Sequence, residues 1–296
     1  MLYKTTKMKQ NTIFLLGLLL FIIQTQVLGQ IKSYLPPKAT NCLVLLEKKF
    51  NGNFVPHATG FLLQSYYIDA PVTVVTNEHV LRNRNIYVTV PADSNLVQLM
   101  RIRKKRYFNI DNTTWEVFGN KLRHDFKLIP DSTFAVNKDL DIGVFNISIG
   151  NSTTIDDSIE IKVSSIIALG SSSIKYKKDI PLGTNVFFVG FPFFIGTELG
   201  FMNNSIKRMY AENVPNPLVR SGSIAWISDN NDSFLLDAFS YPGNSGSPVI
   251  TISDIQNRTY IIGIVSGHLS ATGNDNIGLA NCVWMDDIIE LIEKLE

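Results

Sequence analysis

The chain has 296 residues, of which 45% are hydrophobic and 18% charged, a composition that suits a folded protein and excludes disorder over most of its length. This length is sufficient for one large hydrophobic core or two smaller ones. With 27 basic and 26 acidic residues the net charge is +1, so no excess of positive charge favours nucleic acid or an anionic membrane as a partner.

The N-terminal segment 1–29 has the features of a signal peptide. Several lysines precede an apolar run from Ile13 to Ile23, and small residues around Gly29 suit a signal peptidase. We expect cleavage after Gly29 and export of 30–296 to the periplasm or the medium. The apolar run is shorter than the roughly 20 residues of a membrane span, so we expect membrane contact only transiently, during export. An uncleaved anchor stays open as an alternative.

Short apolar segments bounded by turn residues dominate the rest of the chain and predict an all-β sandwich or barrel. The expected strands are 41–50, 58–67, 72–81, 85–93, 141–148, 184–194, 221–228, 233–239, 247–253, 259–267 and 278–284. The polar segment 101–138 reads as an enlarged connection between strands.

The one convincing helix comes last. Asp286 is its expected N-cap, and one apolar stripe joins Ile288, Leu291, Ile292 and Leu295. Because the chain stops there, we expect no second domain.

The chain has two cysteines, Cys42 and Cys282. Export permits a disulfide between them, and two buried free thiols are the equal alternative. Neither the cysteines nor the histidines have metal-ligand spacing, so we expect no metal and no cofactor.

The segment "YPGNSGSPVI", 241–250, places Ser245 in a glycine-rich turn before an apolar strand. Gly243 and Gly246 permit positive φ and the close approach of a substrate carbonyl. The amides of Gly243 and Ser245 then point into one hole, which is what a serine nucleophile needs for its oxyanion.

A serine nucleophile also needs a base and an acid that orients the base. Of the four histidines, only His79 closes an apolar, strand-like run beside a turn. His57 and His124 lie in polar surroundings that suit solvent-exposed side chains. The segment "KDLDIGVF" offers Asp139 and Asp141 on one face of an extended segment, and Asp141 is favoured because it directly precedes the apolar "IGVF".

Together these segments resemble the trypsin-like, or chymotrypsin-fold, serine peptidases. "TNEHV", "DIGVF" and "GNSGSPV" are similar to the family's segments around the histidine, the aspartate and the serine. "HATGFLL", "FFVGFPF", "VRSGSIAWI" and "LDAFSYPGNSG" resemble the exported bacterial branch, meaning Htr/Deg-type proteases and glutamyl endopeptidases.

The resemblance implies two six-stranded antiparallel β-barrels followed by the C-terminal helix, with the boundary between the barrels near 150–180. It implies His79 as general base, Asp141 as its orienting partner and Ser245 as nucleophile, with the amides of Gly243 and Ser245 as oxyanion donors.

The resemblance also places the primary substrate pocket, with Phe239 at its base and Val265, Ser266 and Gly267 in its wall. No acidic residue stands at that base, so we expect a small or apolar substrate side chain rather than arginine or lysine. The alternative is that Phe239 points into the barrel core.

Some features depart from the family. Asn244 stands where digestive trypsins have the aspartate that pairs with a freed N-terminus, so we expect no zymogen activation of that kind. The peptide-binding domain that Deg-type proteases carry is not expected. Val265 occupies the position of the histidine in glutamyl endopeptidases, which counts against selection for glutamate, although His268 follows closely.

The sequence therefore predicts an exported serine endopeptidase that acts on proteins or peptides through an acyl-enzyme. A catalytically silent binding protein of the same fold and a membrane protein held by the signal segment are the alternatives.

Overall fold

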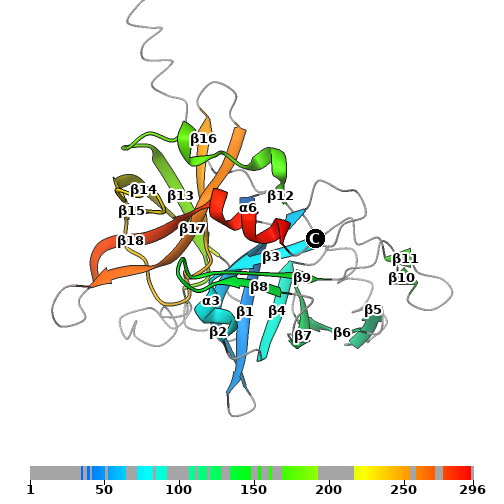
Figure 1. Cartoon of the computed structure of the whole chain (residues 1–296). Coiled ribbons are helices and arrows are strands. Elements are labelled where there is room, and N and C mark those ends of the chain that lie inside the picture. The colour runs from blue at the N-terminus through cyan, green and yellow to red at the C-terminus, as the bar shows by residue number, and fades with distance from the viewer. Residues whose placement is uncertain are drawn as a thin grey trace, which may run out of the picture. The chain divides into compact units, whose positions relative to one another are not determined.

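The computed structural model describes the main part of the chain (Figure 1). The residues described are 35, 39–40, 42–50, 53–64, 72–82, 85–91, 107–110, 113–118, 121–127, 134–147, 153–154, 160–161, 169–192, 217–253, 258–270 and 276–294. All of them belong to one compact unit, 35–253 together with 258–296. The expected signal peptide and its cleavage site lie outside the described residues.

The first half of the chain forms a ten-stranded sheet in the order β5-β6-β7-β4-β1-β2-β3-β9-β8, with β12 added in parallel to β2. Its strands are β1 (Leu43–Phe50), β2 (Asn53–Gln64), β3 (Val72–Thr76), β4 (Asn85–Pro91), β5 (Tyr107–Ile110), β6 (Thr113–Phe118), β7 (Lys121–Lys127), β8 (Phe134–Asn137), β9 (Ile142–Ile147) and β12 (Leu169–Gly170). A separate small pair joins β10 (Thr153–Thr154) to β11 (Glu160–Ile161).

The second half forms a closed antiparallel barrel of six strands, in the order β13-β14-β15-β18-β17-β16. Its strands are β13 (Asn185–Gly190), β14 (Leu218–Ile227), β15 (Ser233–Asp237), β16 (Pro248–Ser253), β17 (Arg258–Ser270) and β18 (Asn276–Trp284). Two short 3₁₀ turns, η2 (Ser171–Ser173) and η3 (Lys177–Asp179), lie between the two halves in sequence.

The expected all-β class, a six-stranded barrel and the C-terminal helix are confirmed. The first half differs in detail, because the segment 101–138, taken as a connection, contains the strands β5 to β8. Among the described residues, no pairing joins β5 to β8, the two ends of this strand order. A closed barrel together with a second sheet agrees with the expected chymotrypsin-like fold.

Helix α6 (Met285–Glu293) is the last helix of the described residues and buries Ile288, Leu291 and Ile292, as the apolar stripe predicts. The predicted cap is wrong: Trp284 holds the N-cap position, and Asp286 lies in the first turn. Its carboxylate instead accepts a hydrogen bond from the Lys177 N–H at 2.9 Å, which ties the helix to η3. Leu295 lies outside the described residues.

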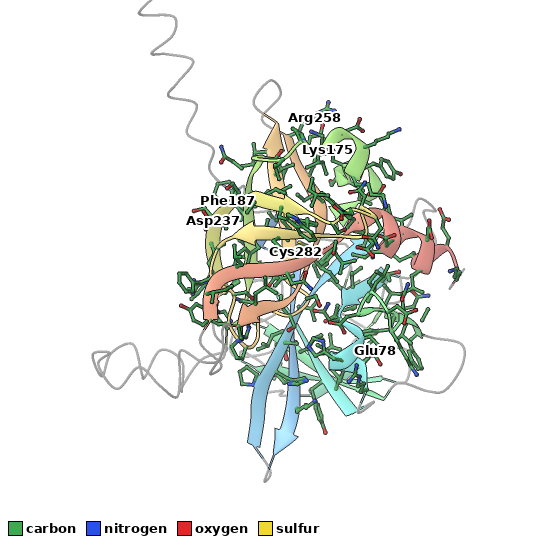
Figure 2. The ribbon with its side chains drawn as sticks, turned by 60° about the vertical axis from the view of Figure 1, so that its left-hand side comes forward. Glu78, Lys175, Phe187, Asp237, Arg258 and Cys282 are labelled. Atoms are coloured by element: carbon green, nitrogen blue, oxygen red, sulfur yellow. The ribbon has the colours of Figure 1, made fainter. Side chains whose placement is uncertain are left out.

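The two cysteines are buried free thiols, so the disulfide alternative is not realised. Cys42 packs in the core cluster that includes Phe61 and Ile288, whereas Cys282, labelled in Figure 2, packs with Phe234 and Trp284 inside the closed barrel. Burial raises the pKa of the Cys42 thiol to about 12 and that of Cys282 well above its usual value. Both sulfurs are protonated at neutral pH and unsuited to nucleophilic chemistry.

Among the helices that the structure describes, none has the length and apolar character needed to cross a bilayer.

Candidate active site

His79 lies on a one-turn helix rather than at the end of a strand. Strand β3 stops at Thr76, and α3 (Glu78–Leu81) begins two residues later. The helix packs on β9 at Gly143, where a Cβ would lie 2.6 Å from a methyl group of Leu81. A side chain at position 143 would therefore displace the Leu81 side chain and press on the Asn77 carbonyl, which would lie 3.1 Å from the added Cβ.

Asp141 faces His79 from a tight turn. Residues 138–141 form a turn, and Asp141 has φ of +56°, a left-handed conformation that aspartate tolerates better than most residues. The predicted extended segment is therefore wrong here, and Asp139 is exposed. The Asp141 carbonyl accepts hydrogen bonds from the Asn77 side chain at 2.8 Å and the Glu78 N–H at 3.3 Å, which fix the turn against α3.

The carboxylate of Asp141 accepts hydrogen bonds from both His79 and Ser266. His79 Nδ1 lies 2.8 Å from Oδ2 and 3.0 Å from Oδ1, and the backbone N–H of His79 donates to Oδ1 at 3.0 Å. The Ser266 hydroxyl donates to Oδ2 at 2.8 Å. Burial alone would raise the pKa of Asp141, but the hydrogen bonds from His79 and Ser266 hold it below its usual value. The group is therefore an anion at neutral pH and favours a proton on Nδ1 of His79.

Ser245 lies where two consecutive turns meet. The Asn244 N–H donates to the Tyr241 carbonyl, and the Ser247 N–H donates to the Asn244 carbonyl, each at 2.9 Å. Pro242 stands second in the first turn, and glycines with φ of +96° and +82° stand third in the two turns, the pattern of type II turns. Sequence reasoning expected this conformation at Gly243 and Gly246.

This double turn leaves two amides without a partner. The N–H groups of Gly243 and Ser245 occupy middle positions of the turns, and neither donates a hydrogen bond within the described part of the chain. Gly243 is buried and Ser245 half-buried. Two backbone donors next to the serine hydroxyl are thus available to an incoming oxygen atom.

The Ser245 hydroxyl donates to the Ser266 carbonyl at 3.4 Å, a long hydrogen bond. Within the described residues it makes no hydrogen bond to His79. Ser266 therefore contacts two of the three predicted catalytic residues: its hydroxyl donates to Asp141, and its carbonyl accepts the hydrogen bond of Ser245. The structure thus gathers His79, Asp141 and Ser245 around one residue of β17.

The residues of the predicted pocket are not all placed as expected. Phe239 is 49% exposed, stacks on Tyr241 and lines a cavity of about 510 Å³, so it does not point into the core. The side chain of Val265 is fully buried in the barrel core, and Val265 is not among the residues that line this cavity. Ser266 faces Asp141, and neither it nor Gly267 lines that cavity.

The cavity beside Phe239 has both apolar and charged walls. Val219 and Ile277 line it with apolar side chains, whereas Arg220 and Asp237 carry opposite charges (Figure 2 labels Asp237). The Arg220 guanidinium stacks 4.5 Å from the centre of the Tyr241 ring.

Sequence reasoning missed the structural roles of three residues. Ser266 was expected in the pocket wall, Thr59 was not singled out, and His57 was taken as exposed although it is half-buried with Nε2 unpartnered among the described residues. His57 is the extra residue of a β-bulge in β2, since Leu46 pairs with Ala58 and Glu47 with Pro56. Burial, followed by the charges of Lys48 and His79, lowers the pKa of His57 to about 4.

The fold and the site together define a chymotrypsin-like protein. The family model of the trypsin-like peptidase domain matches residues 58–258, which is more than half of the chain. The chain belongs to the trypsin-like peptidase family. No curated protein sequence matches it.

Two solved structures of similar fold are both of the HtrA-type protease AlgW with a tripeptide, one of them a variant. They are 14% and 15% identical to this chain, each with a TM-score of 0.50. The match covers 87% of this chain and 61% of either AlgW chain. The likeness supports the chymotrypsin-like fold.

Proposed function

We propose that the protein is an exported serine endopeptidase that cleaves proteins or peptides through His79, Asp141 and Ser245. The observation that carries the proposal is the Asp141 carboxylate, which binds the His79 ring at 2.8 Å and the Ser266 hydroxyl at 2.8 Å, while the Ser266 carbonyl receives Ser245. The triad is thus connected through one carboxylate and one strand.

In the proposed mechanism, the Asp141 carboxylate accepts a hydrogen bond from Nδ1–H of His79 and keeps the proton on that nitrogen, which leaves the Nε2 lone pair free to act as a base. Ser245 Oγ attacks the peptide carbonyl carbon, and its proton passes to Nε2. The amides of Gly243 and Ser245 bind the oxyanion of the tetrahedral intermediate. His79 then donates the proton to the leaving amine, and water, activated in the same way, hydrolyses the acyl-enzyme.

The Ser245 hydroxyl must rotate from the Ser266 carbonyl toward His79 for this reaction. Catalytic hydrogen bonds are often long in a protein without substrate and shorten in the complex. The same feature is the specific observation in favour of the alternative, a catalytically silent protein of this fold that binds peptides.

We infer that the cavity beside Phe239 receives a substrate side chain, and that 1–29 directs export and is removed. Mass spectrometry of the exported protein should find Gln30 at the N-terminus. An intact segment 1–29 would support the membrane-held alternative.

The test of hydrolysis uses purified protein 30–296 with casein as substrate. Wild type should cleave casein, and Ser245→Ala and His79→Ala should each lose at least a thousandfold in turnover while keeping the circular dichroism of the folded protein. Ser172→Ala, which changes an exposed serine on η2, is the matched control and should keep full activity. Equal hydrolysis by wild type and both site variants would overturn the proposal.

A further inference from the structure

Thr59 joins the two halves of the proposed site. It is completely buried in β2, and its hydroxyl donates to the Gly243 carbonyl at 2.7 Å. The same oxygen accepts the N–H of Phe191, just after β13, at 2.9 Å. One hydroxyl of the first sheet therefore bonds two backbone groups contributed by the second half of the chain.

The backbone of Thr59 adds two further bonds. Its N–H donates to the Ser245 carbonyl at 2.9 Å, and its carbonyl accepts the Thr76 hydroxyl at 2.9 Å. Thr76 is the last residue of β3 before the segment that carries His79. Thr59 thus holds the carbonyls of both residues whose amides are the proposed oxyanion donors, and it is tied to the strand that leads to the base.

Thr59 is packed tightly against the second turn of the serine segment, at Gly246. A Cβ at Gly246 would lie 2.1 Å from the Thr59 carbonyl oxygen and 2.5 Å from the Thr76 hydroxyl. A change in the position of Thr59 would therefore displace the turn that contains Ser245.

We propose that Thr59 is a positioning residue for the oxyanion hole, because its hydroxyl fixes the orientation of the Gly243–Asn244 peptide. Gly243 has φ of +96° and no side chain, so its own conformational preference restrains the turn weakly. Holding the Gly243 carbonyl keeps the glycine from rotating and keeps its N–H directed toward the substrate oxygen. The inference rests on the proposed function, since an oxyanion forms only if Ser245 attacks a carbonyl.

The consequence is a specific kinetic signature. An oxyanion hole stabilises the transition state more than the bound substrate, so a misdirected donor lowers kcat and leaves KM nearly unchanged. Complete loss of one donor costs about a hundredfold to a thousandfold in kcat. A donor that is present but poorly directed should cost about tenfold to a hundredfold.

The experiment compares Thr59→Val with Thr59→Ser. Valine keeps the shape and removes the hydroxyl, whereas serine keeps the hydroxyl and removes a methyl group. We expect Thr59→Val to lose about tenfold to a hundredfold in kcat with KM changed less than about threefold, and Thr59→Ser to stay within about threefold of wild type.

Thr251→Val is the matched control. Thr251 is also buried, and its hydroxyl donates to a backbone carbonyl, that of Asn185, at 3.1 Å, but it lies on β16 away from the turn. The Thr251→Val variant should lower the unfolding midpoint to a similar degree as Thr59→Val and keep the kcat of wild type. A loss of kcat in Thr251→Val equal to that in Thr59→Val would show a general effect of destabilisation and would overturn the inference.

A second measurement needs no knowledge of the preferred substrate. The rate constant for inactivation by a small fluorophosphonate depends on the same hole, and we expect it to fall about tenfold or more in Thr59→Val and to be restored in Thr59→Ser. Wild-type rates in Thr59→Val, with Ser245→Ala inert, would overturn the role of Thr59 and leave the nucleophile intact. Full labelling of Ser245→Ala would instead overturn the proposed function itself.

Discussion

The two halves of the proposed site are held in different ways. The acid–base half consists of His79 on α3 and Asp141 in the turn before β9. Its contacts involve a charged carboxylate that accepts hydrogen bonds from side chains and backbone. The nucleophile half is the turn around Ser245, which is held by backbone hydrogen bonds and by Thr59. The acid–base half of the site depends on charge, and the nucleophile half depends on backbone conformation.

The difference follows from what each half must do. A base has to bind and release a proton, so its partner must be an anion whose pKa stays low, as that of Asp141 does. An oxyanion hole must have its donors in place before charge develops, and rigid backbone amides meet that need without reorganisation. Replacements of charged groups should therefore change chemistry far more than stability, whereas replacements in the turn should change both strongly.

The largest expected effect comes from the acid–base half. Asp141→Asn keeps the shape of the side chain and removes its charge, so the amide no longer favours a proton on Nδ1 of His79. We expect turnover on casein to fall about ten-thousandfold. The unfolding free energy at pH 7 should change by about 1–2 kcal/mol. Turnover within tenfold of wild type would contradict the role of the carboxylate.

The next largest effect is expected in the nucleophile half, where two glycine substitutions distinguish backbone strain from steric collision. Gly246→Ala introduces a Cβ 2.1 Å from a backbone oxygen at φ of +82°, whereas Gly183→Ala introduces one at φ of +80° into open space. We expect a loss of about 1–2 kcal/mol of unfolding free energy for Gly183→Ala from backbone strain alone. Gly246→Ala should lose at least about 3 kcal/mol, together with activity, because the turn must move. Urea unfolding measures both, and equal losses would show that the turn has room to adjust.

The segments of the site could be predicted from sequence, but their connections could not. Ser245 and its glycines lie within one short motif, and Asp141 directly precedes an apolar strand, so local pattern was sufficient. Thr59 bonds Gly243 across 184 positions, and no local pattern gives such a register. The inward direction of Val265 and the hydroxyl contact of Ser266 likewise depend on how β17 is placed in the closed barrel.

The first sheet was harder to predict than the barrel for a related reason. The barrel strands are apolar and bounded by clear turns, whereas 107–127 is polar and carries the pairings of β5, β6 and β7. A polar strand gives little periodic signal, because the pattern that identifies a strand in a sequence is the alternation of apolar and polar residues.

The smallest expected effect concerns the pH dependence of stability and His57, the half-buried histidine. His57 has a pKa of about 4 in the folded protein against an ordinary value of 6.5, so the unfolded chain binds more protons between these values. Stability should therefore be lost as the pH falls from about 6.5 to 4, by about 1–2 kcal/mol for a half-buried ring. His57→Gln cannot titrate and should show a flatter dependence in urea unfolding at pH 7 and pH 4.5. Identical pH dependence in the two proteins would exclude His57 as the source.

The central claim is that Ser245 is a nucleophile activated by His79, and covalent labelling tests it most directly. Folded wild-type protein is treated with a fluorophosphonate, digested and mapped by mass spectrometry, with His79→Ala alongside. We predict a single phosphonyl adduct on the peptide that contains Ser245, formed at least a thousandfold more slowly in His79→Ala. An adduct on another residue, or no adduct on folded wild-type protein, would contradict the account.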